Sequence, residues 1–351
     1  MVSVFVRTIK GLHFFNKGGI LLSKKIGYYR ANTNIALIKY WGKRNKELFL
    51  PMTSSLSLTL DAFYTDTKVT VDSNLSQDYF TLDGVAQSYS DTQKVSKFVD
   101  LFRKLAGSQE HVHIESVNHV PTAAGLASSA SAFSALACAL NQAFNLNLDQ
   151  RTLSTIARQG SGSASRSLFG GFVEWHKGKG DDSDSSYAEQ IADADWDIAM
   201  LVIVINDQKK KISSRVGMEH TIQTSPFFAL WPQEVEKDLA LIKKAIKDKD
   251  FKTLGEVTEH NAMKMHATTI AANPSLTYWA PDSITALQAA QSLREDLGFE
   301  CYATMDAGPN VKVLCRKSEI DALSKQLLTH FKPEQLIKAY PGEAPRPLPI
   351  D

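Results

Sequence analysis

The chain has 351 residues, 43% of them hydrophobic, and a formal net charge of +1. This length suffices for two packed lobes, whereas so small a net charge gives no overall field that would attract nucleic acid or an anionic membrane. Three scattered cysteines exclude a disulfide framework and a zinc finger and are typical of a reducing compartment such as the cytoplasm, and no apolar run reaches the ~18–20 residues that cross a bilayer.

The first 26 residues are basic. They contain Arg7, Lys10, Lys17, Lys24 and Lys25 and no acidic residue. A basic, acid-free start is one property of a targeting peptide, but the long apolar core and cleavage site of a secretory signal are missing. We therefore interpret residues 1–26 as an N-terminal extension.

Residues 27–42 begin as a predicted strand and lead to an unusually placed lysine. Lys39 stands among apolar residues, namely Ile35, Leu37, Ile38 and Trp41. A lysine in that setting either extends its ammonium to the surface or is held next to an anion. Lys39 and Lys43, with the Tyr40 hydroxyl between them, offer two cations and a donor to such an anion.

The next hundred residues alternate between strand and helix patterns. Period-two alternation predicts strands at 54–60, 65–71 and 111–117, with a turn at 82–85. Apolar residues at helical spacing predict a helix over 91–105, which Gly107 ends.

A loop of small residues then enters a predicted helix, over residues 121–137. Ser128 and Ser129 fall at its N-cap or first turn, where a hydroxyl accepts from free backbone N–H groups. Those N–H groups and the positive end of the helix dipole favour an anion, so we expect a phosphoryl group, most simply that of a nucleotide. A buried Ala-rich helix with a serine cap is the alternative. The stretch is neither a P-loop nor a dinucleotide motif, because it lacks Gly-Lys-Ser and spaced glycines.

A second stretch rich in glycine and serine covers residues 160–171, after a predicted helix at 148–157. Its composition is that of a flexible loop. However, Ser161 and Ser163 lie close to Arg166, and closely spaced hydroxyls with a guanidinium can bind a carboxylate or phosphate. An anion cradle is therefore the second interpretation.

Residues 177–195 are polar and acidic, and we interpret them as a solvated loop rather than a metal site. Residues 197–206 are predicted to be a buried strand, and we place a lobe boundary just before it. The basic run 209–211 leads to Ser214 and Arg215, and from these residues alone we interpret the stretch as a solvated turn and helix start.

The last third is predicted to contain helices over 228–246, 251–272, 282–297 and 319–331, followed by a Pro-rich tail. Between the last two helices, residues 299–315 are typical of a hairpin. Asp306 lies at its turn, before Ala-Gly-Pro-Asn, where an aspartate commonly bonds its own backbone.

Four separated motifs resemble, in order, those of the GHMP kinase superfamily and, within it, the diphosphomevalonate decarboxylase family. They are Asn-Ile-Ala-Leu-Ile-Lys-Tyr-Trp-Gly-Lys at 34–43, Thr-Ala-Ala-Gly-Leu-Ala-Ser-Ser-Ala at 122–130, Gly-Ser-Gly-Ser-Ala-Ser-Arg-Ser at 160–167 and Asp-Ala-Gly-Pro-Asn at 306–310. The third departs from the family pattern at Ser165, where a cysteine is usual. The resemblance covers most of the chain after residue 27.

The resemblance implies an α+β, two-lobe GHMP kinase-like fold with helices packed on antiparallel or mixed sheets. It implies a ribosomal protein S5-like N-terminal lobe over residues 27–196 and a ferredoxin-like C-terminal lobe over residues 197–351. It also implies site residues. Catalytic roles fall to Asp306, Lys39 and Arg166; substrate contacts to Asn34, Tyr40, Lys43, Ser161, Ser163, Arg166, Ser214 and Arg215; and ATP contacts to Gly125, Leu126, Ala127, Ser128, Ser129 and Ala130.

The implied reaction is the ATP-dependent decarboxylation of (R)-5-diphosphomevalonate to isopentenyl diphosphate, in the mevalonate route to isoprenoids. We expect ATP with Mg²⁺ held by its phosphates, no dedicated protein metal site, and a cytoplasmic homodimer that binds neither nucleic acid nor membrane. Three alternatives stay open at this point: a phosphomevalonate decarboxylase, a mevalonate 3-kinase, and a non-catalytic sensor of a phosphorylated metabolite.

Overall fold

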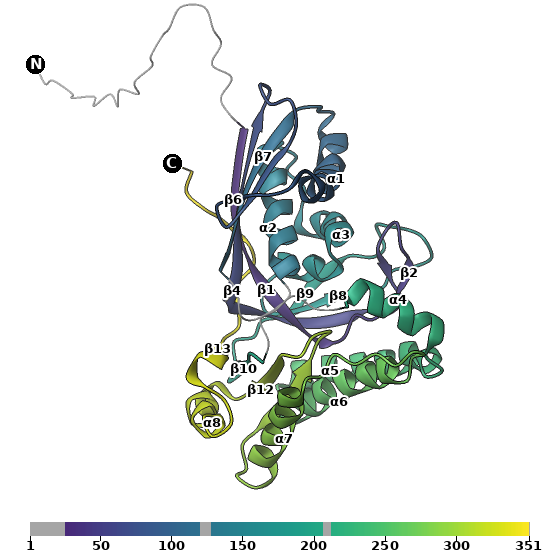
Figure 1. The fold of residues 1–351 in the computed structure, drawn as a ribbon, viewed down its shortest axis with the longest axis vertical. Helices are drawn as coiled ribbons and strands as arrows, with labels where there is room; N and C mark the ends of the chain where they lie inside the picture. Colours follow the sequence, from purple (N-terminus) through teal and green to yellow (C-terminus); the bar gives the residue numbers. More distant parts are fainter. Residues whose placement is uncertain (1–24, 120–127, 206–211, 351) are drawn as a thin grey trace, which may run out of the picture.

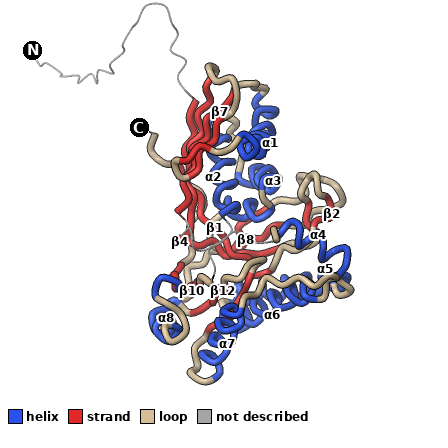
Figure 2. The backbone as a smooth tube through the Cα atoms, viewed as in Figure 1, coloured by secondary structure: helices blue, strands red, loops and turns tan. Residues whose placement is uncertain are grey.

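The computed structural model describes residues 25–119, 128–205 and 212–350. Within them the fold is α+β, with an eight-stranded sheet, a four-stranded sheet and a two-stranded hairpin (Figures 1 and 2). Residues 1–24 of the predicted extension, residues 120–127 before the helix at 128, and the basic run 209–211 lie outside the described residues, whereas Lys25 and Ile26 of the predicted extension begin the strand Lys25–Ile38.

The eight-stranded sheet has a main path in the order β14-β1-β4-β7-β5-β6, and β8 and β9 extend it from β4. All its pairings are antiparallel except that of β5 with β7, so the sheet is mixed. Its strands are β1 (Lys25–Ile38), β4 (Ser55–Asp72), β5 (Tyr79–Leu82), β6 (Val85–Ala86), β7 (His111–His119), β8 (Phe172–Trp175), β9 (Ala188–Ala192) and β14 (Arg346–Pro347).

The predicted strands at 54–60 and 65–71 are two halves of the single strand β4. Its pairing with β1 shifts register between Asn32 and Thr33, whose partners are Tyr64 and Leu60. The first half pairs with β8 and the second with β7. The polar Asp61 at this irregularity breaks the alternation, and for that reason the sequence pattern shows two strands where the backbone makes one.

Three helices cover one face of this sheet: α1 (Tyr89–Ala106), α2 (Ser128–Ala143) and α3 (Gln150–Gly160) (Figure 1). The predicted end of α1 is confirmed, because Gly107 has the left-handed φ of +60° that suits glycine. Helix α2 lies against β1 so closely that a Cβ at Gly27 would come 1.9 Å from the carbonyl oxygen of Ala139. The helix is therefore fixed over the strand that leads to Lys39.

Residues 160–171 are not a flexible loop. A 3₁₀ segment, η2 (Gly162–Leu168), forms there, and Ser165, Arg166 and Leu168 within it are buried. Small side chains permit this burial, since they leave room for the segment between α3 and the sheet. Composition alone does not distinguish such a packed turn from a linker.

The second sheet has the order β11-β12-β10-β13 and is antiparallel. Its strands are β10 (Ala199–Ile203), β11 (Cys301–Met305), β12 (Val311–Cys315) and β13 (Leu336–Ala339). The Pro-rich tail, for which no strand was predicted, contributes β13 to this sheet and β14 to the first. Both strands are too short to show a period of their own, and their partners β10 and β1 define them.

Helices α5 and α6 lie along the second sheet, on the side toward the first (Figure 1). The helices after β10 are α4 (Ser214–Thr224), α5 (Trp231–Asp248), α6 (Phe251–Ile270), α7 (Pro281–Glu295) and α8 (Ile320–Leu327). One hydrophobic cluster joins Ile35 and Leu58 of the first sheet to Met200 of the second and Leu254 of α6. The two sheets therefore share a core, and the end of β1 meets the β11–β12 turn there.

The predicted lobe boundary at 196/197 falls between β9 and β10, which belong to different sheets. The return of β14 to the first sheet crosses that division, and the division into two domains stays a prediction. No helix within the described ranges is long and apolar enough to cross a membrane.

Candidate active site

Lys39 follows the last residue of β1 and is buried, with 2% of its surface exposed. Its Nζ donates to the carbonyl oxygen of Ala36 at 2.7 Å and to Oδ1 of Asp306 at 2.9 Å. Its backbone N–H donates to Oδ1 of Asn261 on α6 at 2.8 Å. Main chain and side chain are thus both held, so the ammonium has a defined position.

Asp306 comes directly after β11, in the turn that leads to β12. Its Oδ1 faces Lys39, and its Oδ2 lies 3.1 Å from Nζ of Lys312. The side chain is 31% exposed, whereas the two lysines are 2% and 4% exposed. The carboxylate therefore bridges two buried ammonium groups and presents its remaining surface to a cavity.

Opposing effects set the charge states of this cluster. Burial raises the pKa of Asp306, but the ammonium groups of Lys312 and Lys39 outweigh it and hold the pKa well below the usual range of an aspartate. Burial also lowers the pKa of Lys39, and the Asp306 carboxylate opposes that shift. The aspartate is consequently ionised at neutral pH and available to accept a proton in a reaction.

Arg166 enters the same cavity from η2. Its Nε donates to Oδ1 of Asn34 at 3.2 Å and its NH1 group donates to Oγ of Ser55 at 2.6 Å. Asn34 in turn donates to the carbonyl oxygen of Ser163 and to Oγ of Ser167. Burial lowers the pKa of Arg166 to about 10, so the guanidinium still carries its charge at neutral pH.

The serine residues predicted as ligands come together from two segments. Oγ of Ser161 lies 3.2 Å from Oγ of Ser129 in the first turn of α2 and 3.2 Å from Oγ of Ser163. Gly162 between them is required, because a Cβ there would come 2.8 Å from the ring of Tyr40. The buried hydroxyl of Tyr40 finds no hydrogen-bond partner among the described residues, which leaves it able to bond a ligand.

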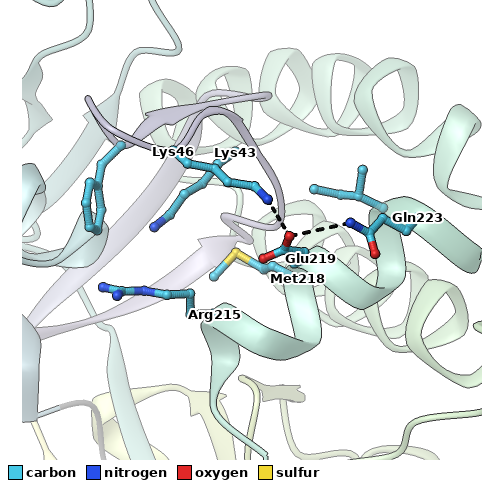
Figure 3. Close-up of a pocket in the computed structure, with 8 residues that line it drawn as sticks. Lys43, Lys46, Arg215, Met218, Glu219 and Gln223 are labelled. Atoms are coloured by element: carbon cyan, nitrogen blue, oxygen red, sulfur yellow. Dashed lines mark hydrogen bonds and ion pairs between the residues drawn. The ribbon is translucent and has the colours of Figure 1, made fainter.

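Lys43 and Arg215 both line this cavity, and they lie on opposite sides of the neighbouring pocket drawn in Figure 3. Lys43 belongs to the short strand β2 (Lys43–Asn45), and Arg215 lies in the first turn of α4, which Ser213 caps by accepting from the N–H of Val216. Burial, together with the charges of Arg215 and Lys46, lowers the pKa of Lys43 to about 8.

One cavity of about 440 Å³ collects most of the predicted site. The predicted residues that line it are Asn34, Lys39, Tyr40, Lys43, Ser129, Ser161, Ser163, Arg166, Ser214, Arg215 and Asp306. Ala130 is buried and does not line it. Gly125, Leu126 and Ala127 lie outside the described residues, and Ser128 is the first residue of α2.

Sequence reasoning missed Lys312, Ser55, Ser167 and Asn261. Lys312 had a signal: it is the single charged residue in the otherwise apolar Val311–Cys315, where alternation places it opposite Val311 and Val313. The two serines and Asn261 have no comparable signal, because each is an ordinary residue of a strand, turn or helix until the fold brings it to Arg166, Asn34 or Lys39.

Comparisons with known proteins agree with this geometry. Residues 31–188 match a family model described as "Diphosphomevalonate decarboxylase-like N-terminal domain", and residues 200–347 match "Mevalonate 5-diphosphate decarboxylase C-terminal domain". The diphosphomevalonate decarboxylase of Candida albicans is 38% identical over 86% of this chain and 87% of its own length. The chain belongs to the diphosphomevalonate decarboxylase family. The human enzyme of that name is 35% identical over 81% of this chain and 75% of its own length.

Solved structures of diphosphomevalonate decarboxylases have the same fold. The one from Staphylococcus aureus superposes with a TM-score of 0.90 at 46% identity, over 94% of this chain and 100% of its own. The one from Enterococcus faecalis gives a TM-score of 0.88 at 50% identity, over 93% of this chain and 99% of its own. The GHMP kinase-like α+β fold predicted from the four motifs is confirmed.

Proposed function

We propose that this chain converts ATP and (R)-5-diphosphomevalonate to isopentenyl diphosphate, CO2, ADP and phosphate. The observation that carries the proposal is the Asp306 carboxylate, ionised between Lys39 and Lys312 and open to a cavity lined with hydroxyls and cations. Family membership supports it, as does a 51% identical relative solved as "MDDEF in complex with MVAPP, AMPPCP and Magnesium".

Asp306 acts on the tertiary hydroxyl at C3 of the substrate. That hydroxyl is a poor nucleophile and a poor leaving group, and phosphorylation by ATP corrects the second fault. Asp306 accepts or orients the hydroxyl proton during transfer, a contribution typically worth ~10²–10⁴-fold. Lys39 and Lys312 keep the carboxylate ionised and fix its direction.

Arg166 orients the substrate's carboxylate. Two of its five N–H donors are engaged by Asn34 and Ser55, which fixes the plane of the guanidinium. The remaining donors bind the carboxylate so that the bond to CO2 aligns with the orbital that empties at C3 as phosphate departs. Loss of CO2 then forms the double bond.

The diphosphate end of the substrate binds where the other donors gather. The unpartnered Tyr40 hydroxyl, the charges of Lys43 and Arg215 and the hydroxyls of Ser161 and Ser163 all face one cavity. Asn34 and Ser214 complete the set. These donors suit a dianionic or more highly charged group, which favours the diphosphate over the monophosphate.

ATP is assigned to the N-terminus of α2, through Gly125, Leu126, Ala127, Ser128, Ser129 and Ala130. The Ser129 hydroxyl lines the cavity at the first turn of the helix, and this position suits a phosphate bound by backbone N–H groups. Among the described residues no group of three or more histidine, cysteine or acidic side chains gathers as a metal site. Mg²⁺ carried by the ATP phosphates would neutralise their charge during transfer.

A substrate panel tests the proposal. Purified protein is incubated with ATP and either diphosphomevalonate, phosphomevalonate or mevalonate, and release of ADP and of CO2 is followed separately. We expect both products with the diphosphate alone. Release of ADP without CO2 would indicate a 3-kinase, CO2 from the monophosphate would indicate the sister decarboxylase, and binding without ADP release would indicate a sensor.

We also propose a cytoplasmic homodimer that binds no nucleic acid. Family resemblance and the net charge of +1 support this proposal. Size-exclusion chromatography with light scattering tests the oligomeric state, and an elution at the mass of a single 38.8 kDa chain would contradict it.

A further inference from the structure

Phe49 occupies a strained position beside the cavity. It ends the turn between β2 and β3 (Leu50–Pro51), with a φ of +55° that non-glycine residues rarely adopt. Hydrogen bonds from within the turn and from helix α3 fix its conformation. Oδ1 of Asn45 accepts from the N–H groups of Glu47 and Leu48, and Nε of the fully buried Arg158 donates to the carbonyl oxygen of Leu48 at 3.1 Å.

This conformation brings the ring of Phe49 to two cations. Nζ of Lys43 lies 3.6 Å from the ring centre, and Cζ of Arg215 lies 5.2 Å from it. Both distances are within the range of cation–π attraction. Phe49, Lys43 and Arg215 line both the large cavity and a neighbouring one of about 270 Å³.

The cations Lys43, Lys46 and Arg215, which line one pocket, repel one another unless a negative group offsets their charge. Lys46 is paired with Glu219 and turns away from Lys43 and Arg215 (Figure 3). Lys43 and Arg215 each lie beside the Phe49 ring, whose face is negative. An aromatic ring attracts a cation without occupying the hydrogen-bond donors that a phosphate needs.

We propose that Phe49 is a positioning residue, whose ring holds Lys43 and Arg215 in place to receive the diphosphate of the substrate. This inference rests on the proposed function for the identity of the anion. The strained turn makes this positioning possible, because it places the ring between strand β2, which carries Lys43, and helix α4, which carries Arg215.

The ring also influences the charge of Lys43. The charged or titratable groups that share its cavities are Lys39, Tyr40, Arg166, Arg215 and Asp306, with Lys46 and Glu219 at the rim. Asp306 is engaged by Lys39 and Lys312, and Glu219 by Lys46. Attraction by the ring favours the charged lysine, so loss of the ring lowers the pKa of Lys43 further below about 8.

The test compares Phe49→Leu with Phe49→Tyr. Leucine and tyrosine meet the same backbone strain, but only tyrosine keeps the ring. We expect Phe49→Leu to raise KM for diphosphomevalonate roughly three- to tenfold with kcat nearly unchanged, and Phe49→Tyr to resemble wild type. In Phe49→Leu the rise of KM with pH should also begin at a lower pH. Phe49→Asn, which tolerates the left-handed conformation, should show the same rise in KM without added backbone strain.

Several outcomes would overturn the inference: a KM for Phe49→Leu that is unchanged or lower, equal losses in Phe49→Leu and Phe49→Tyr, or a fall in kcat alone. Titration calorimetry with inorganic diphosphate measures the same contrast without turnover. If the wild-type protein does not release CO2 but Phe49→Leu still binds inorganic diphosphate more weakly than wild type, the proposed function fails and the role of Phe49 stands. If CO2 is released and neither KM nor diphosphate affinity changes, only this inference fails.

Discussion

Lys312 gives the Asp306 carboxylate a second cation. Its side chain is buried, its Nζ also donates to the carbonyl oxygen of Asn310, and it approaches the oxygen of Asp306 that Lys39 does not contact. Two ammonium groups on separate oxygens fix the carboxylate in orientation as well as in charge. A base held in this way needs no reorganisation when the hydroxyl proton leaves.

Replacement of Lys312 tests that role. We expect Lys312→Met to reduce kcat by about ten- to a hundredfold, or ~1.4–2.8 kcal/mol, with a smaller change in KM, because Asp306 loses one of its two ammonium partners. The loss of a neighbouring cation also raises the pKa of Asp306. Steady-state assays of ADP release measure both constants. Lys312→Arg keeps the charge and serves as the control; a Lys312→Met enzyme with wild-type kcat would contradict the role.

The lowered pKa of Lys43 predicts that the affinity for the substrate depends on pH. Its pKa is lowered to about 8, so the lysine is protonated below that pH and loses its charge above it. KM for diphosphomevalonate should therefore be level below about pH 8 and rise above it. Lys43→Arg stays charged throughout and should remove the rise. A wild-type KM that is level up to pH 9.5 would contradict the assignment of Lys43 to the diphosphate.

At the scale of elements, α6 anchors the end of β1. Asn261 accepts from the backbone N–H of Lys39 and donates to Oδ2 of Asp238 on α5 at 2.8 Å. Lys264 contacts both oxygens of Asp238. A chain of polar contacts thus runs from the helix pair to the main chain of Lys39.

Asn261→Ala breaks this chain. It leaves the buried N–H of Lys39 without its partner, which costs about 1–3 kcal/mol, and it removes one hydrogen bond from the Asp238 carboxylate, which keeps its contacts with Lys264. We expect a lower free energy of unfolding in urea and a lower kcat. Thr258→Val on the same helix is the control, because the buried Thr258 hydroxyl has no partner among the described residues. Equal decreases of the free energy of unfolding and of kcat in the two variants would show that α6 tolerates no substitution, and would contradict a specific role of Asn261 in positioning Lys39.

The helices and strands also show which features of the molecule could be predicted from its sequence. Lys39 was predicted because an ammonium does not suit an apolar strand end, whereas Asp306, an ordinary turn residue by itself, was predicted from the family motif Asp-Ala-Gly-Pro-Asn that it begins. β13, β14 and the continuity of β4 were missed, because pairing with distant strands defines them. Asn261 was missed for the same reason, because its partner Lys39 lies 222 residues away, whereas Lys312 was missed although it stands out in an apolar strand close to its partner Asp306.

At the scale of the molecule, the site exists only where the two sheets meet. Lys39 ends a strand of the first sheet, and Asp306 follows a strand of the second, 267 residues later in the sequence. The hydrophobic cluster that contains Ile35, Leu58 and Met200 holds the two sheets together beneath the ion pair. The two residues therefore meet at one cavity, although they are distant in the sequence.

Turnover of Asp306→Asn is the measurement that tests this account most directly. The asparagine fills the same space but accepts no proton and pairs with no ammonium. We expect binding of diphosphomevalonate to be nearly intact, while release of ADP and CO2 falls by ~10²–10⁴-fold. Near-normal release of ADP and CO2 by Asp306→Asn, with substrate binding unchanged, would show that the carboxylate between Lys39 and Lys312 is not the catalytic base.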